Sequence, residues 1–265
     1  MIKNLFFTFL LLSIFMKAHA HEALPVWQKN IIAQTETFFS DLAEKEFGKK
    51  FRTIIKDDTS ISGAAEQTHT ELVLKLTTGL LNSPRLGQDS LRMLICHELG
   101  HLFGGAPRKS APFDWDGPIG QDGKSLLSSE GQSDYYAGAV CFRKLLALDS
   151  SQTPPPWTAL IGPELTKKCA QSTDVNLCYR TALAGENFLN LVYDFDISTE
   201  KTDDSIAESI FYNIYPDRQC RLDTIINGAA CNSTLSFALN EYDHSKNDCP
   251  ESYAQRPKCW YVKQP

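Results

Sequence analysis

Two histidines and a glutamate stand within one short stretch of the sequence, His97-Glu98-Leu99-Gly100-His101. If this stretch is helical, residues four apart lie on nearly the same face, so both imidazoles can bind one metal ion. Glu98 points to the side, where it can reach a water molecule at the metal without binding the metal itself. Catalytic zinc keeps three protein ligands and one position for water, whose pKa it lowers to about 7. The stretch therefore predicts hydrolytic zinc chemistry with Glu98 as general base.

This HExxH pattern is typical of zinc metallopeptidases. A match of this length also occurs by chance, and the simplest alternative is a surface helix with two solvated histidines. The context favours the metal site, because the pattern lies within an apolar-periodic stretch at residues 94–102 and follows a predicted strand.

A third protein ligand must come from elsewhere in the chain. One class of zinc peptidase supplies a histidine at the position that Pro107 occupies here, and proline cannot bind zinc. Another class takes a glutamate from a downstream helix, and Glu130 and Asp134 lie four residues apart on such a predicted helix. We expect Glu130 to bind the zinc and Asp134 to orient a histidine ligand by accepting a hydrogen bond from its free ring nitrogen. The alternative is a solvated acidic helix start, since carboxylates favour a helix N-terminus.

The layout HExxH followed by ExxxD resembles the gluzincin metallopeptidases. It is most similar to their compact HtpX-type and Ste24-type branch, over residues 72–81, 89–107 and 130–136. The resemblance implies a zincin-like fold, one zinc ion and peptide-bond hydrolysis, within about residues 50–147. The chain departs from that branch in lacking its membrane helices and in placing only 28 residues between His101 and Glu130.

Peptide hydrolysis also requires a group that stabilises the oxyanion. The candidates are Tyr135, Tyr136, Tyr212, Tyr215, Arg221 and His244. Each tyrosine could instead serve packing, and Arg221 could pair with Asp223 or Glu130, so none is singled out. The alternating strand expected at residues 70–76 is interpreted as a sheet edge that could hold an extended peptide by backbone pairing, although it could also be an ordinary half-buried strand.

The elements that must position these residues follow from hydrophobic periodicity and from turn residues. Strands are expected at residues 51–55 and 70–76, and loops at residues 63–65 and 107–127. Thr153-Pro154-Pro155-Pro156 is the clearest linker. Helices are expected at residues 25–47, 90–103, 130–147, 174–193 and 204–214.

The chain has 8 cysteines, an even number that suggests disulfides in an exported protein. A Cys96–Cys141 bridge would join the two helices that carry the metal ligands. Cys169–Cys178 and Cys249–Cys259 are local pairs across turn-rich segments. Cys220 and Cys231 are hard to join if residues 218–227 are helical, and the eight thiols allow many other pairings.

The first 20 residues hold Lys3 and Lys17, no acid, and an apolar run at residues 5–16 that ends at Ala18-His19-Ala20. This arrangement predicts a cleavable signal peptide and a periplasmic or extracellular destination. Cleavage would leave 265 − 20 = 245 residues with 26 − 2 = 24 basic and 32 acidic groups, a net charge of −8. This charge argues against a nucleic-acid partner, and no later segment is apolar enough for an integral membrane segment.

The sequence thus predicts an exported zinc metallopeptidase that acts on a peptide or protein substrate. The expected fold is α+β, mostly helical with a small sheet and a disulfide-braced C-terminal region. A signal peptide (1–20) precedes a catalytic domain (21–150), zincin-like by resemblance, and a helical, cysteine-bearing region (151–265) packed on it. The alternatives are an exported zinc-binding protein without activity and an interaction protein that binds its partner through the acidic, cysteine-rich tail. An intact Glu98 favours hydrolysis, because a structural zinc site needs no base.

Overall fold

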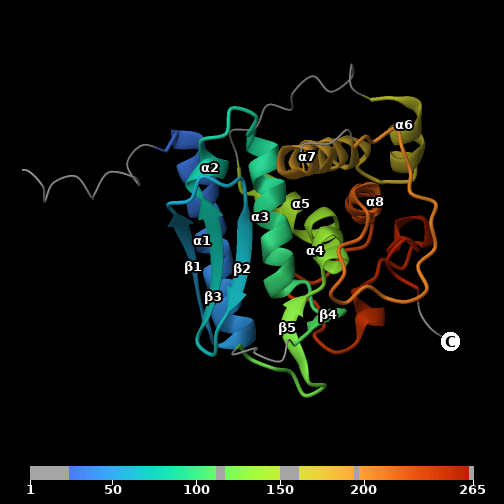
Figure 1. Cartoon of the computed structure of the whole chain (residues 1–265). Helices are drawn as coiled ribbons and strands as arrows, with labels where there is room; N and C mark the ends of the chain where they lie inside the picture. The colour runs from blue at the N-terminus through green and yellow to red at the C-terminus, as the bar shows by residue number, and fades with distance from the viewer. Residues whose placement is uncertain (1–23, 112–116, 150–160, 194–196, 263–265) are drawn as a thin grey trace, which may run out of the picture.

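The computed structural model describes residues 24–111, 117–149, 161–193 and 197–262, and it combines helices with two small sheets (Figure 1). The predicted signal peptide and the proline-rich linker at residues 153–156 lie outside these ranges. The expectation of a mixed, largely helical protein with a small sheet and disulfides near the C-terminus is confirmed. Within the described ranges, no helix is long and apolar enough to cross a membrane.

The larger sheet has three strands in the order β1-β3-β2. β1 (Lys50–Lys56) runs parallel to β3 (Glu71–Thr77), and β2 (Gly63–Gln67) runs antiparallel to β3. The inward side chains of β3 are fully buried, whereas its partly exposed Glu71 pairs with Arg52 on the outer face. Val73, on the same face as Glu71, is buried as well, so the alternation separates a core face from a face that is only partly solvated.

Two predictions about the sheet, the edge position of the strand at residues 70–76 and the loop at residues 63–65, are wrong. β3 was expected at a sheet edge, but it is the central strand, and the edge next to the site is β2, where a loop was expected. Local pattern misses β2 because small residues predict strands poorly. Their size has a packing reason: a Cβ on Gly63 would lie 2.8 Å from Leu94 Cδ2 and 3.0 Å from Glu98 Oε1. Glycine here lets the edge strand pass close to the following helix.

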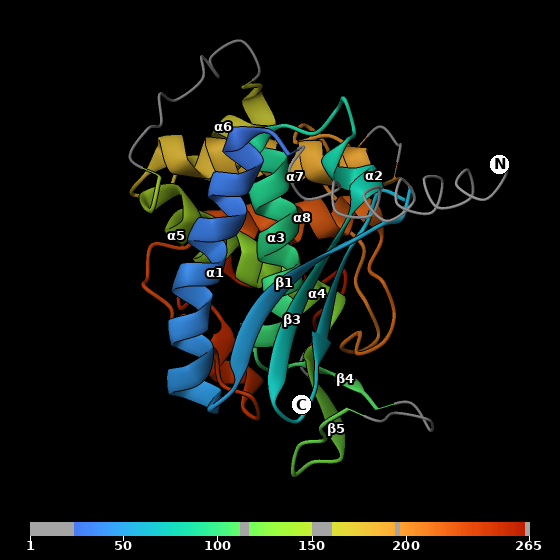
Figure 2. The same ribbon diagram turned by 90° about the vertical axis from the view of Figure 1, so that its left-hand side faces the viewer.

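Two long helices pack against this sheet. α1 (Val26–Phe47) lies along β1 and ends at Gly48, whose φ of 63° closes the helix as expected. A short helix, α2 (Thr78–Leu81), leads to α3 (Gln88–Phe103), where the amide of Gly87 donates to Ser90 Oγ at 2.9 Å. α3 lies between the sheet and the C-terminal helices, and every residue from Ser90 to its end is buried (Figures 1 and 2).

The helix expected at residues 130–147 is present with a π-helical turn inside it. It comprises α4 (Glu130–Tyr136), the π turn η1 (Ala137–Cys141) and α5 (Phe142–Ala147). α4 packs closely on α3, since a Cβ on Gly100 would lie 2.6 Å from the backbone of Ser133. The preceding segment is not a simple loop, because β4 (Arg108–Ser110) and β5 (Lys124–Ser128) pair antiparallel.

The C-terminal region adds α6 (Pro163–Cys169), α7 (Val175–Tyr193), α8 (Arg218–Ala229) and two short 3-10 turns, η3 (His244–Asn247) and η4 (Ser252–Ala254). The prediction of a helix at residues 204–214 is wrong, since this segment is irregular. α7 packs on α3, while α8 packs on α4, η1 and α7, so one hydrophobic core is shared by both parts of the chain.

All 8 cysteines form disulfides. The predicted Cys96–Cys141 and Cys169–Cys178 bridges are confirmed, with Cα–Cα distances of 5.4 and 5.8 Å. The predicted Cys249–Cys259 bridge is wrong, because the structure pairs Cys231–Cys249 and Cys220–Cys259. α8 separates Cys220 from Cys231 by its whole length, so each takes a partner from the C-terminal segment.

Candidate active site

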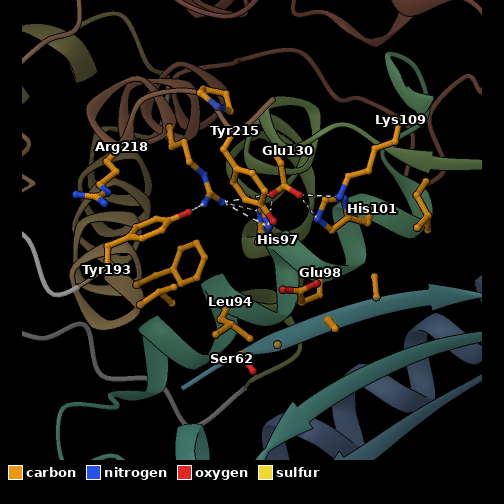
Figure 3. A pocket seen from close by; sticks show the side chains of 18 of the residues that line it. Ser62, Leu94, His97, Glu98, His101, Lys109, Glu130, Tyr193, Tyr215 and Arg218 are labelled. Atoms are coloured by element: carbon orange, nitrogen blue, oxygen red, sulfur yellow. Dashed lines mark hydrogen bonds and ion pairs between the residues drawn. The ribbon is translucent and has the colours of Figure 1, made fainter. Parts of the chain in front are cut away.

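A cleft of about 890 Å³ lies between α3, the edge strand β2 and the C-terminal region (Figure 3). His97, Glu98 and His101 line it from α3, and Glu130 faces them from α4. Residues 62–65 form the β2 side. The other walls come from distant parts of the chain: Lys109, Leu127, Phe188, Tyr193, Tyr215 and Arg218.

Glu130 faces both histidines from the neighbouring helix. Its Oε2 lies 3.4 Å from His97 Nε2, and its Oε1 lies 3.5 Å from His101 Nε2. The two imidazole rings are edge to face, with centroids 4.9 Å apart. All three side chains are nearly fully buried. The one-turn spacing on α3 and the start of α4 therefore bring two ring nitrogens and one carboxylate together.

The outer nitrogen of each histidine has a different kind of partner. His97 Nδ1 lies 2.8 Å from Asp134 Oδ1. His101 Nδ1 lies 2.8 Å from both the Ser128 carbonyl oxygen and Ser133 Oγ. A carbonyl and a carboxylate can only accept, so both Nδ1 atoms carry the proton. In a neutral ring this leaves the Nε2 lone pair directed at the Glu130 side, which is the form that binds a metal.

Asp134 is itself held by a buried arginine from α8. Arg221 Nε donates to Asp134 Oδ2 at 2.7 Å and its Nη2 donates to Asp134 Oδ1 at 2.9 Å, while Nη1 donates to the Tyr193 hydroxyl. Burial would lower the pKa of Arg221, but Asp134 outweighs it and the pKa is raised. Burial would likewise raise the pKa of Asp134, and Arg221 and His97 lower it. The pair is a buried, doubly hydrogen-bonded ion pair that reaches His97.

Neighbouring carboxylates separate the pKa values of the two buried histidines. Burial lowers the pKa of His101 to about 3, so its ring is neutral. Burial also opposes the charged form of His97, but the carboxylates of Asp134 and Glu130 outweigh it and raise the pKa of His97 to about 9. A metal ion at the Nε2 side would displace the second proton from His97.

Glu98 lies beside the two histidines, at the β2 side of the cleft. His97, Glu98 and His101 each offer one ligand atom within 4.8 Å of the others. Burial raises the pKa of Glu98, although nearby His97 opposes the shift. Successive residues of a helix point about 100° apart, so Glu98 does not share the direction in which both histidines face Glu130. The directions leave Glu130 as the candidate third ligand and Glu98 as the candidate base.

The structure brings only two of the oxyanion candidates to the cleft, Tyr215 and Arg221. Tyr215 lies over Glu130 in Figure 3, and burial together with that carboxylate raises the pKa of its phenol. Tyr135 and Tyr136 donate instead to the backbone carbonyls of Ala254 and Phe237. The last two candidates, Tyr212 and His244, do not line the cleft. Tyr212 stacks with Lys124, and His244 contacts the Tyr261 hydroxyl.

Sequence reasoning missed Lys109 and Tyr193. Lys109 Nζ donates to Glu130 Oε1 at 2.7 Å, and the Tyr193 hydroxyl accepts from Arg221. Tyr193 closes the predicted helix at residues 174–193, which hints at its position but not at its partner. Nothing in the sequence distinguishes Lys109, because its segment, which forms β4, was expected to be a loop.

The donor set fits a divalent zinc ion. Glu130 Oε2 is buried, and among the described residues it has no hydrogen-bond partner. It faces His97 Nε2, and burial notwithstanding, His101, His97 and Lys109 hold the pKa of Glu130 far below its usual range, so the carboxylate is ionised. Two imidazole nitrogens and one carboxylate oxygen are the ligand types of open catalytic zinc sites.

Comparison with known proteins found no match to the chain, neither among family models nor among curated proteins or solved structures.

Proposed function

We propose that this chain is a zinc-dependent metallopeptidase of gluzincin type. The observation that carries the proposal is the convergence of His97 Nε2 and His101 Nε2 on the two oxygens of Glu130, at 3.4 and 3.5 Å, in a cleft that Glu98 also lines. His97, His101 and Glu130 would hold the ion. Zinc bound there would supply a Lewis acid that polarises a carbonyl and makes water more acidic.

The chain's own residues would supply proton transfer, orientation of a ligand and stabilisation of the oxyanion. Glu98 takes a proton from the attacking water and delivers it to the leaving amine, and its raised pKa suits a group that must both accept and donate. Asp134, held by Arg221, fixes the ring of His97 through Nδ1. The Tyr215 hydroxyl is the candidate donor to the oxyanion of the substrate carbonyl, because Tyr215 extends over the same site.

The edge strand gives the substrate a place to bind. β2 forms one wall of the cleft, and its outer edge is available for pairing with an extended peptide. Peptide binding by backbone pairing, which the sequence suggested for the strand at residues 70–76, is therefore assigned to β2. A helix that carries HExxH, packed on a small mixed sheet with a neighbouring glutamate helix, supports the zincin-like assignment.

Export is part of the proposal. Four disulfides are compatible with an oxidising compartment, periplasmic or extracellular. Hydrolysis in such a compartment would act on exported or extracellular peptides and proteins.

The deciding experiment compares Glu98→Gln with the unchanged protein. Glu98→Gln should retain zinc by elemental analysis and lose peptide cleavage by about 10²-fold or more, since it removes the base and leaves the ligands. Glu71→Gln, on β3 outside the cleft where Glu71 pairs with Arg52, is the matched control and should keep full activity. Protein that binds no zinc sinks the proposal. Zinc without cleavage of any library peptide would favour the non-catalytic zinc-binding alternative.

A further inference from the structure

The cleft differs in character on the two sides of the histidine pair. Beyond His97 lie the aromatic and apolar side chains of Phe188, Val192 and Tyr193, with Arg218 stacked on Tyr193 at 5.1 Å from its ring centroid. Beyond His101 lies the ammonium group of Lys109, on the opposite side of the site from Tyr193 and Arg218 (Figure 3). A substrate that crosses the site therefore meets a different environment on each side.

Lys109 is held at the site but remains reachable. One of its three N–H donors binds Glu130 Oε1 at 2.7 Å, and 29% of its side chain is exposed. Its neighbours on β4, Arg108 and Ser110, pair with β5, and Leu127 of β5 also lines the cleft. The remaining donors can reach a group bound in the cleft.

The charge balance of the site favours an anionic group there. The cleft is lined by three basic side chains, Lys109, Arg218 and Arg221, and three carboxylates, Glu98, Glu130 and Asp217. With the buried Asp134 behind His97 and with both histidines neutral, the set carries one negative charge. A divalent ion held by the histidines and Glu130 turns this into one positive charge, so a loaded cleft attracts anions.

We propose that Lys109 selects a substrate carboxylate on the His101 side of the cleft, so that the preferred substrates are peptides with an acidic group next to the scissile bond. The inference rests on the proposed peptidase function and names its substrate class. The carboxylate belongs either to an aspartate or glutamate side chain or to the free C-terminus of the peptide. Both sources offer the same two acceptor oxygens to the ammonium group.

The test uses the zinc-loaded, full-length protein and quenched fluorescent peptides with uncharged flanks. One position at a time holds Glu, Gln or Lys, and each peptide is made with a free and an amidated C-terminus. The readout is the ratio of kcat/KM for Glu over Gln at one position within one variant, because this ratio cancels changes in zinc content or overall activity. We expect a ratio of about fivefold on one side of the scissile bond, the size of one partly exposed ion pair.

Two lysine variants assign the effect. Lys109→Met keeps the apolar stem and should bring the ratio to about 1. Lys124→Met is the matched control from the paired strand β5, where Lys124 lies over the Tyr212 ring at 3.8 Å outside the cleft, and should leave the ratio unchanged. A preference seen only with a free C-terminus, and lost in Lys109→Met, identifies the terminal carboxylate as the source. A ratio near 1 in the unchanged protein, or a preference that survives Lys109→Met, overturns the inference.

A binding measurement separates this inference from the peptidase proposal. Fluorescence anisotropy of the same peptides on zinc-loaded Glu98→Gln protein reports the Glu-over-Gln preference without cleavage. If the unchanged protein cleaves no peptide, the peptidase proposal fails, and selective binding of acidic peptides that depends on Lys109 still supports the carboxylate site. Equal binding of the Glu and Gln peptides refutes the carboxylate site, whether or not cleavage occurs.

Discussion

The functional groups on the two sides of the cleft come from differently spaced parts of the sequence. The α3–α4 side takes its functional groups from two short stretches, His97 to His101 and Glu130 to Asp134. The opposite side collects Tyr193 from α7, Arg221 from α8 and Tyr215 from the segment before α8. The first side carries a local pattern that predicts chemistry, whereas the second exists only because the C-terminal helices pack on α3 and α4.

The difference shows that the C-terminal region completes the site. Arg221 neutralises Asp134, which orients His97, so an element more than a hundred residues away controls a candidate metal ligand. Cys220 precedes Arg221 and is bridged to Cys259, which fixes this part of α8 to the last described segment. We therefore expect substitutions in the C-terminal region to disturb the histidine pair on α3 as well.

The largest expected effect follows from Arg221→Leu. Its loss leaves the buried Asp134 carboxylate without its cation, so the free energy of unfolding should fall by about 3–5 kcal/mol. Urea denaturation of the metal-free protein measures it. Arg218→Leu, one turn earlier on α8, is the control and should cost less than about 1 kcal/mol, because the half-buried Arg218 stacks on Tyr193 whereas Arg221 neutralises the buried Asp134.

A double variant tests the cause of that loss. Asp134→Asn combined with Arg221→Leu removes both charges, so it should be more stable than Arg221→Leu alone. Equal stability of the single and double variants would mean that Arg221 acts through packing and not through Asp134.

Glu130→Ala should have the next largest effect, on zinc affinity. It removes the proposed third metal ligand, so the affinity should fall by more than the roughly 10- to 100-fold typical of losing an outer hydrogen-bond partner. Ser133→Ala, which removes only the hydroxyl beside His101 Nδ1, should stay within that smaller range. Competition with a chromophoric chelator measures both. An unchanged affinity in Glu130→Ala would transfer the ligand role to Glu98, the other carboxylate close to both histidines.

Sequence alone could predict the local side of the site because one helix turn brings His97 and His101 together. It could also predict the long helices and the Cys96–Cys141 bridge, which follow from periodicity and helix adjacency. It could not predict β2, whose small residues carry no strand signal and whose Gly63 allows close approach to α3. Nor could it assign Arg221, since only the packing of α8 on α4 decides which carboxylate it meets.

Tyr215→Phe should lower the rate of peptide cleavage by about tenfold. A preorganised oxyanion donor contributes roughly 10²- to 10³-fold, and Tyr215 should contribute less because 60% of the residue is exposed on an irregular segment. The loss should appear in kcat, with KM and zinc content unchanged, since the hydroxyl would act on the transition state. Tyr212→Phe, whose ring lies under Lys124, is the control. An equal kcat in Tyr215→Phe would remove Tyr215 from the catalytic groups.

The smallest expected effect is a difference between two disulfides of the C-terminal region. Cys220–Cys259 spans 39 residues and Cys169–Cys178 spans 9, so loop entropy predicts stabilisation of about 4 and about 2.6 kcal/mol. Replacing each pair by alanines and measuring urea unfolding should show the long-range bridge to be worth about 1.3 kcal/mol more. Only its removal should also slow peptide cleavage, because Cys220 adjoins Arg221 whereas the local bridge joins α6 to the start of α7. Equal effects on cleavage would show that the long-range bridge stabilises the region without holding Arg221 at Asp134.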